Sequence, residues 1–233
     1  MTVFRQEFGK VILLVGLFLL PELLGSLVLD RMMRSGIRII EIYRYWVLGA
    51  MVLQMLAQAP AVQVTYARLT GRPVRAVDAL GRSRGRYASA LGIGVAEHLV
   101  TLIGIVFFGF YSLILNIVWF LMMAAFWYVA LSAVLIENRG VLAGLKRSAS
   151  LTKGYRWRVF GLVLVAAIAP GLGIYFLDMA LFQILGRDIL IVVDFPLRVL
   201  VISAQTIIGT VTYHSLRTAK EGHAVERLSE VFA

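Results

Sequence analysis

A chain of 233 residues that is 60 % hydrophobic and only 15 % charged cannot fold as a soluble domain, because a soluble surface needs more polar side chains than this. Its net charge of +10 is gathered in short segments between apolar runs, a pattern that orients membrane proteins and argues against a nucleic-acid partner. The absence of cysteine excludes disulfides and thiolate metal sites. The composition therefore predicts a polytopic, all-α membrane protein.

Six apolar runs are long enough to cross a bilayer as helices, which takes roughly 20 residues each. The spans are expected over residues 11–29, 45–66, 88–109, 114–136, 159–181 and 195–216. Residues 1–233 are thus predicted to form a single integral membrane domain, a transmembrane helical bundle of about six spans. Gln54, Gln58 and Gln63 in the second span are polar enough to need partners inside such a bundle.

Two basic segments between the spans, residues 71–87 and 139–153, carry apolar residues at helical spacing. We expect amphipathic helices in the cytoplasmic membrane interface, with the apolar face on the membrane and the cations toward anionic headgroups; the alternative is an ordinary basic loop. In the second segment the stripe would comprise Val141, Leu142, Leu145, Ala149 and Thr152, and Gly154 would end the helix. The residues expected to bind anionic phospholipid or a protein partner are Lys146, Arg147, Lys153, Arg156, Trp157, Arg158, Arg82, Arg84 and Arg86.

The distribution of lysine and arginine predicts the orientation of the chain. Both termini and both basic segments hold most of these residues, whereas residues 30–44 and 186–194 mix fewer of them with acids. We therefore expect a multi-pass protein of the bacterial cytoplasmic (inner) membrane with both termini in the cytoplasm.

Two stretches resemble a known family. RSASLTKGYRWR resembles the R-S-x-x-L-T-x-G-x-x-W-R signature of the glycerophosphoryl diester phosphodiesterase membrane-domain family, and YHSLRTAKEG resembles its usual terminus, Y-x-x-L-R-x-x-K-E-G. The matched positions are Arg147, Ser148, Leu151, Thr152, Gly154, Trp157 and Arg158, then Tyr213, Leu216, Arg217, Lys220, Glu221 and Gly222. The resemblance implies a stand-alone membrane part. It does not imply phosphodiesterase activity, because the His-Arg-Gly element of the family's catalytic barrel is absent.

Charged side chains within spans are costly and mark candidate functional sites. Here they are Glu22, Glu97, His98, Asp178 and Arg198. Glu97 and His98 point about 100° apart on a helix, so they should not face one site together. The favoured interpretation is a helix-to-helix polar clamp in which each group is paired inside the bundle. The alternative is transport chemistry, with Glu97 and His98 relaying protons or binding a cation.

The sequence shows no catalytic constellation, metal-ligand spacing or phosphate-binding loop, so we expect neither a cofactor nor an enzyme. The remaining enzyme hypothesis is a lipid-modifying protein, and no residue cluster supports it. The sequence predicts an accessory, assembly or scaffold subunit that contacts other membrane proteins and anionic lipid. The alternative function is a small-molecule or lipid transporter with Glu97 and Glu22 lining a cavity. A packed interior would favour the first hypothesis, and a polar cavity at mid-membrane would favour the second.

Overall fold

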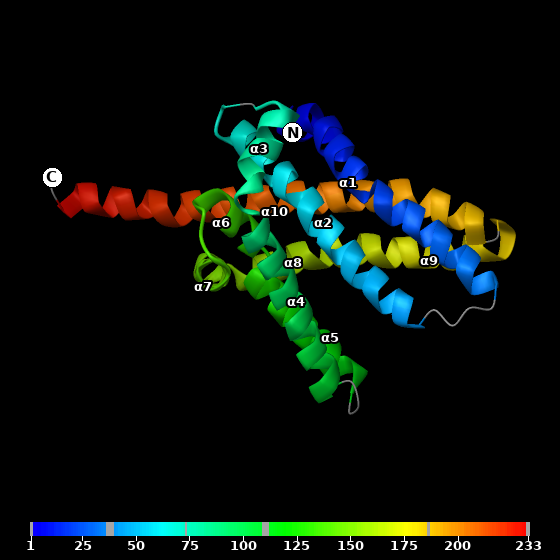
Figure 1. Cartoon of the computed structure of the whole chain (residues 1–233). Helices are drawn as coiled ribbons and strands as arrows, with labels where there is room; N and C mark the ends of the chain where they lie inside the picture. The colour runs from blue at the N-terminus through cyan, green and yellow to red at the C-terminus, as the bar shows by residue number, and fades with distance from the viewer. Residues whose placement is uncertain (1, 36–39, 73, 109–111, 186, 232–233) are drawn as a thin grey trace.

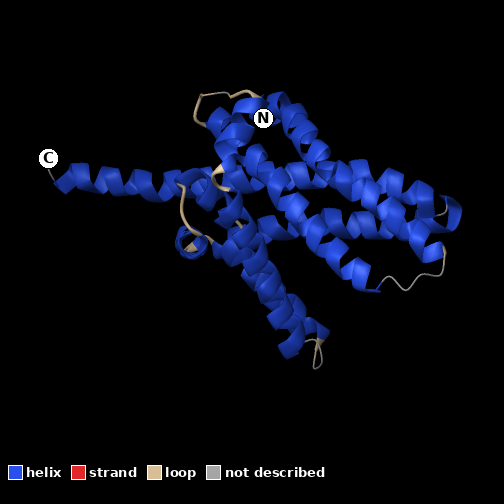
Figure 2. Cartoon of the chain, in the orientation of Figure 1, coloured by secondary structure: helices blue, strands red, loops and turns tan. Residues whose placement is uncertain are grey.

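A computed structural model describes residues 2–35, 40–72, 74–108, 112–185 and 187–231, and these residues are helical almost throughout, with no strand among them (Figures 1 and 2). The first half comprises α1 (Thr2–Arg34), α2 (Ile40–Leu69), α3 (Ala76–Arg84), α4 (Tyr87–Phe108) and α5 (Leu113–Trp127). The second half comprises α6 (Ala130–Glu137), α7 (Val141–Thr152), α8 (Arg156–Val163), the π-helical turn η1 (Leu164–Ile168), α9 (Ala169–Leu185) and α10 (Arg187–Val231).

Six helical stretches are long and apolar enough to cross a membrane, which confirms the predicted all-α polytopic fold. They cover Phe8–Arg34, Tyr45–Leu69, Tyr87–Phe108, Ile114–Glu137, Arg156–Phe182 and Ile189–Gly222. The fourth stretch contains α5 and α6, and the fifth contains α8, η1 and α9. The π-helical turn lies directly before Pro170, whose missing N–H and bulky ring disturb the regular hydrogen bonds of the preceding turn.

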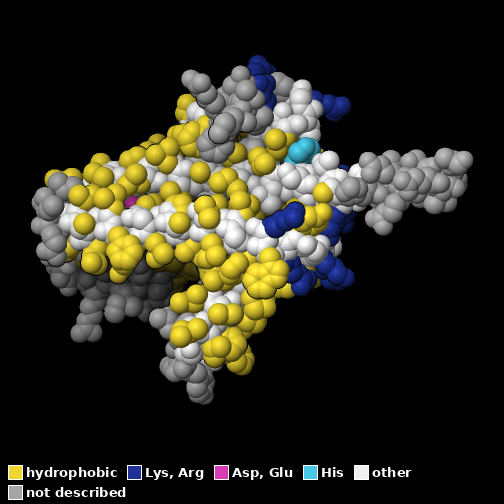
Figure 3. Space-filling model, turned by 180° about the vertical axis from the view of Figure 1, so that it is seen from behind, with side chains coloured by type: hydrophobic (Ala, Val, Ile, Leu, Met, Phe, Trp, Pro, Cys, Tyr) yellow, Lys and Arg dark blue, Asp and Glu magenta, His cyan; other side chains and the backbone are white. Residues whose placement is uncertain are grey.

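The spans fall into two groups (Figure 1). Helices α1, α2, α9 and α10 run side by side, with α1 packed against both α2 and α10, whereas α4 and α5 form a hairpin that diverges from them. The short helices α3, α6 and α7 gather at one end, which also holds the start of α1. Seen from behind, apolar side chains cover the long body and the lysine and arginine side chains collect toward that same end (Figure 3). We call it the basic end.

Both basic segments form short helices, α3 and α7. The bounds of α7 are close to the predicted 139–153, whereas α3 begins five residues after and ends three residues before the predicted 71–87. The buried face of α7 differs from the predicted stripe, however. It comprises Gly144, Leu145, Ser148, Leu151 and Thr152, while Leu142 is 74 % exposed. A Cβ added at Gly144 would lie 2.1 Å from Cγ2 of Val134, so glycine allows α7 to approach α6 closely. The face that was expected to rest on lipid therefore packs largely on the protein itself.

The turn after α7 follows the sequence prediction. Gly154 has a φ of +89°, in the left-handed region that glycine adopts without strain, and the chain turns there from α7 into α8. The core beneath this turn is formed by Leu151, Val159 and the fully buried Tyr213 of α10. It joins α7 and α8 to the long C-terminal helix at the basic end.

Candidate functional site

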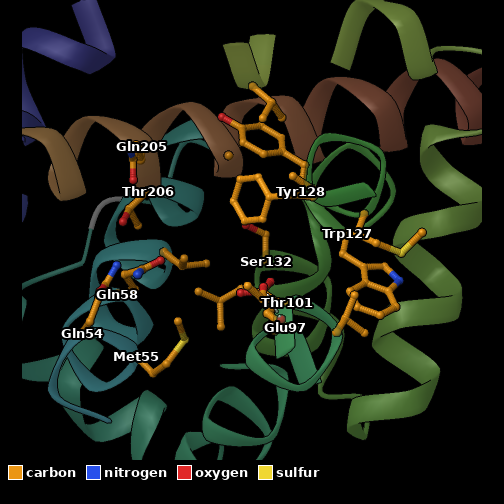
Figure 4. Close-up of a pocket in the computed structure, with 18 of the residues that line it drawn as sticks. Gln54, Met55, Gln58, Glu97, Thr101, Trp127, Tyr128, Ser132, Gln205 and Thr206 are labelled. Carbon is orange, nitrogen blue, oxygen red and sulfur yellow. Dashed lines mark hydrogen bonds between the residues drawn. The ribbon is translucent and has the colours of Figure 1, made fainter. Parts of the chain in front are cut away.

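A cavity of about 360 Å³ lies between α2, α4, the α5–α6 span and α10. Glu97, Gln58 and Gln205, which line it, are all close to the middle of their spans. Polar side chains enter the cavity from each of these elements (Figure 4). They are Gln54 and Gln58 of α2, Glu97 and Thr101 of α4, Ser132 of α6, and Gln205 and Thr206 of α10. The bundle is therefore hollow and polar at a depth where packed apolar side chains are the usual filling.

The remaining wall of this cavity is aromatic and apolar, and it comes mainly from α5. Trp119, Phe120, Met123 and Trp127 line it. The indole N–H of Trp119 donates to the carbonyl of Val100 at 3.1 Å, and the ring packs so closely on Gly104 that a Cβ there would lie 2.5 Å away. The α4–α5 hairpin thus holds this indole in place, and the cavity has one hydrogen-bonding side and one aromatic side.

Glu97 carries the one carboxyl group among the described residues that line this cavity. Within the described part of the chain, its side chain makes no hydrogen bond or ion pair, and only its backbone carbonyl accepts a bond, from Thr101 at 2.9 Å. The expected helix-to-helix clamp is therefore not formed by Glu97. The physical reason is that α2 and α10 present amides and hydroxyls at this depth, while most of the cations lie at the ends of the spans.

Other polar groups on the wall also lack partners among the described residues. The hydroxyl of Tyr128 is buried and makes no hydrogen bond. The amides of Gln54, Gln58 and Gln205 make none either, whereas Gln63, one turn further along α2, donates to the carbonyl of Leu135 at 2.9 Å. Unsatisfied polar groups in a membrane interior are costly, so their concentration in one cavity points to a ligand or water that satisfies them.

A second recess, of about 480 Å³, lies between α1, α2 and the first half of α10. Arg198 of α10 pairs there with Glu22 of α1 at 3.6 Å and with Asp194 of its own helix. This triad is the kind of intramembrane clamp that the sequence predicts.

His98 also lines this recess, with Nδ1 at 2.9 Å from the carbonyl of Gly94. Glu97 and His98 therefore face different cavities, in agreement with their expected angular separation. Asp178, on α9, lines neither cavity.

The nine residues that the sequence nominates for lipid or partner binding separate into two sets. Lys146, Lys153, Arg82, Arg84, Arg156, Trp157 and Arg158 are exposed, and Trp157 is the most exposed large apolar side chain at 85 %. Two of these cations also rest on aromatic rings: Arg156 lies 4.1 Å from the ring centre of Phe126, and Arg158 lies 5.7 Å from that of Tyr155. Arg86 and Arg147 instead bind within the protein, Arg86 at the carbonyl of Leu135.

Arg147 belongs to a network that the sequence does not reveal. Its Nε donates to Glu137 at 2.8 Å, and its Nη2 pairs with Glu221, which lies near the end of the α10 span. Tyr213 donates its hydroxyl to the same Glu137 oxygen at 2.7 Å, and Arg217 binds Glu221 at 2.7 Å. The basic segment that forms α7 and the end of the α10 span thus meet here, and we call these five residues the Glu137 network.

Charge stabilises this network. Burial lowers the pKa of the Arg147 guanidinium, but the hydrogen bonds and negative charges of Glu137 and Glu221 outweigh that effect and raise its pKa above the ordinary value for arginine. The network therefore stays charged and is a fixed part of the fold. The contact between Tyr213 and Glu137 cannot be predicted from local sequence patterns, because the two residues lie 76 positions apart in the chain.

No group of three or more metal-ligating side chains able to hold an ion occurs among the residues that the structure describes. Comparisons with protein-family models, with curated proteins and with solved structures find no match for this chain. The function must therefore be argued from the geometry of the two cavities and the basic end.

Proposed function

We propose that this protein binds and carries small amphiphilic molecules within the membrane, using the cavity around Glu97. The observation that carries the proposal is the two-sided wall at mid-span, with hydrogen-bonding groups on α2, α4 and α10 and aromatic rings on α5. Such a wall suits a molecule that has one polar and one apolar part, and a volume near 360 Å³ falls in the range of small-molecule sites. A scaffold that only packs against partners has no need for this cavity.

Tryptophan fluorescence provides a direct test, because Trp119 and Trp127 lie on the wall. In a Trp46→Phe, Trp157→Phe background, a brominated single-chain alkyl maltoside should quench these two indoles saturably in nanodiscs. Thr101→Phe fills the cavity and should weaken the binding by at least about tenfold. The matched control is the next residue, Leu102→Phe, since Leu102 is 55 % exposed on the outer surface of α4. Non-saturable quenching, or equal quenching in both variants, would contradict the proposal.

The orientation of the chain belongs to the same proposal. We infer that the basic end faces the cytoplasm of a bacterial inner membrane, so that both termini lie inside, because lysine and arginine collect there. Single cysteines at the exposed positions Arg84 and Lys153 should react with an impermeant maleimide only after the inner face is opened. A cysteine at the exposed Ser35 should react in intact cells. The reverse pattern would overturn this orientation.

A second candidate function, an accessory or assembly subunit, is favoured by the end of α10. This helix continues to Val231, and its last turns project away from the other helices (Figure 1). Such a segment offers a surface to a membrane-protein partner beside the exposed cations of the basic end. Co-purification in mild detergent, with and without the residues after Gly222, would test this function. A partner that is lost with the segment supports it, and an unchanged set of partners argues against it.

A further inference from the structure

The two cavities are stacked along the same helices across the membrane. Along α2, residues from Trp46 to Gln54 line the second recess and residues from Gln54 to Val62 line the first cavity. At about 1.5 Å per residue, residues 46 to 62 rise about 24 Å. Along α10, residues 191 to 209 cover both cavities and rise about 27 Å on the same scale. The hydrocarbon core of a bilayer is roughly 30 Å thick, so the pair covers most of it.

One side chain belongs to both cavities. Gln54 lines the first and the second, and its amide makes no hydrogen bond among the described residues. On helix α4, the adjacent residues Glu97 and His98 line different cavities: Glu97 the first and His98 the second. Gln54 is therefore shared by the linings of the two cavities.

The polar lining of the stacked cavities carries an excess of negative charge. Among the described residues that line the first cavity, Glu97 carries the one carboxyl group, and Trp119, Trp127 and Tyr128 line the same cavity. In the second recess, Glu22 and Asp194 face the guanidinium of Arg198, while Asp30 pairs with Arg34 at 2.6 Å. Oδ1 of Asp194 is buried without a hydrogen-bond partner even though Oδ2 binds Arg198. Carboxylates combined with aromatic faces favour an organic cation over an anion.

We propose that the two cavities are successive binding stations of one transmembrane path for small organic cations, divided by Gln54. The proposal rests on the proposed function, because it assigns the polar part of the amphiphile a positive charge and gives the bound molecule a route. The cation binds at Glu97 with its apolar part on the α5 aromatics. It then passes Gln54 into the recess that holds Glu22 and Asp194.

The class of substrate can be tested with probes of similar shape and opposite charge. Radiolabelled benzyltrimethylammonium and phenylmethanesulfonate would be measured for binding to the protein in nanodiscs. The cation should bind at least about tenfold more tightly than the sulfonate. If both bind equally, the cation assignment fails while the carrier function stands, provided that the brominated maltoside still quenches Trp119 and Trp127 saturably. If neither these probes nor the maltoside binds, the proposed function itself fails.

The path can be tested after folding, because the chain has no cysteine of its own. In proteoliposomes, a Gln54→Cys variant should take up benzyltrimethylammonium until benzyl methanethiosulfonate modifies the thiol. Uptake should then fall at least about tenfold and return when dithiothreitol removes the benzyl group. Leu102→Cys, on the outer surface of α4, is the matched control and should keep its uptake after the same treatment. Mass spectrometry confirms that each thiol is modified. Unchanged uptake in modified Gln54→Cys overturns the path, and so does an equal loss in the control.

Discussion

Glu97 and Glu137 are two glutamates of the same bundle in opposite situations. Glu137 receives hydrogen bonds from Tyr213 and Arg147 and lies 2.5 Å from the guanidinium of Arg139, whereas the carboxylate of Glu97 has no partner among the described residues. Removing a paired carboxylate leaves its hydrogen-bond and ion-pair partners unsatisfied, whereas removing an unpaired carboxylate leaves no other group without a partner. The first arrangement contributes to folding, and the second is costly unless a ligand or a function requires it.

The contrast matters because the sequence suggests the reverse. Glu97 lies inside a predicted span and reads as half of a structural clamp, while Glu137 lies at the end of a span beside a basic segment. The structure gives the pairing to Glu137 and leaves Glu97 facing a cavity. Four sets of substitutions break or sharpen this comparison, and they follow in order of the size of the expected effect.

Glu137→Leu should have the largest effect. It leaves the Arg147 guanidinium and the Tyr213 hydroxyl without their shared acceptor in a part-buried position. Breaking a buried charge pair in this way typically costs about 3–5 kcal/mol of folding free energy. We therefore expect a low yield and a strongly reduced melting temperature in detergent, measured by fluorescence-detected size exclusion after heating. Glu137→Gln keeps an acceptor oxygen and should lose less. A melting temperature equal to that of the wild type would show that the network is dispensable.

Tyr213→Phe tests one hydroxyl of the network. The ring is fully buried and remains in place, so the substitution removes the 2.7 Å bond from the hydroxyl to Glu137 and the long 3.5 Å bond that the hydroxyl accepts from Arg217. Hydrogen bonds to charged groups contribute about 1.5–3 kcal/mol, and we expect a loss of unfolding free energy in that range. Tyr66→Phe is the matched control, because its hydroxyl only accepts a long bond of 3.4 Å from Arg217. An equal loss in both variants would assign the effect to ring packing instead.

The basic end offers a comparison between cations of one segment. Arg147 pairs with Glu137 and Glu221, but Lys146 beside it and Lys153, which directly follows α7, are exposed. Each cation near an anionic surface contributes about 1 kcal/mol to lipid binding. Lys146→Gln with Lys153→Gln should therefore reduce the anionic lipid that co-purifies, as measured by mass spectrometry, without lowering the melting temperature. Arg147→Gln should instead lower the melting temperature. A lipid content that falls only in Arg147→Gln would reverse these assignments.

The sequence predicts the spans well because their signal is local. The length of an apolar run sets a transmembrane helix, and apolar spacing sets the short helices, so six long apolar helices and both short helices form where they are expected. Their ends agree less well: α3 begins five residues later than predicted, and the last span extends six residues further at each end. The pairing of Glu22 with Arg198 also follows from the rule that intramembrane charges need partners, whereas Asp194, which the sequence places in the loop before the last span, was not expected to join them.

The first cavity could not be predicted, because it depends on how four elements are spaced in three dimensions. Gln63 finds a backbone partner and Gln54 and Gln58 do not, although the three residues look alike in the sequence. For the Glu137 network, the sequence offers only indirect evidence that its residues contact one another. Both stretches that resemble one family carry charges of opposite sign, Arg147 in one and Glu221 in the other, and such a pair can be tested for contact before a structure exists.

Glu97→Leu should have the smallest effect on folding. The carboxylate pairs with no described group, so its removal leaves no other side chain unpaired. Placing an apolar side chain at mid-membrane also costs less free energy than placing a carboxyl group there. We expect the free energy of unfolding to stay the same or to rise by about 1 kcal/mol, measured by the same thermal assay as for Glu137→Leu. Binding of benzyltrimethylammonium should nevertheless be lost, and Glu97→Asp, which keeps the charge, should retain part of it. A stability loss comparable to that of Glu137→Leu would mean that Glu97 is a structural partner after all, because only an interaction that favours folding can be lost in that way.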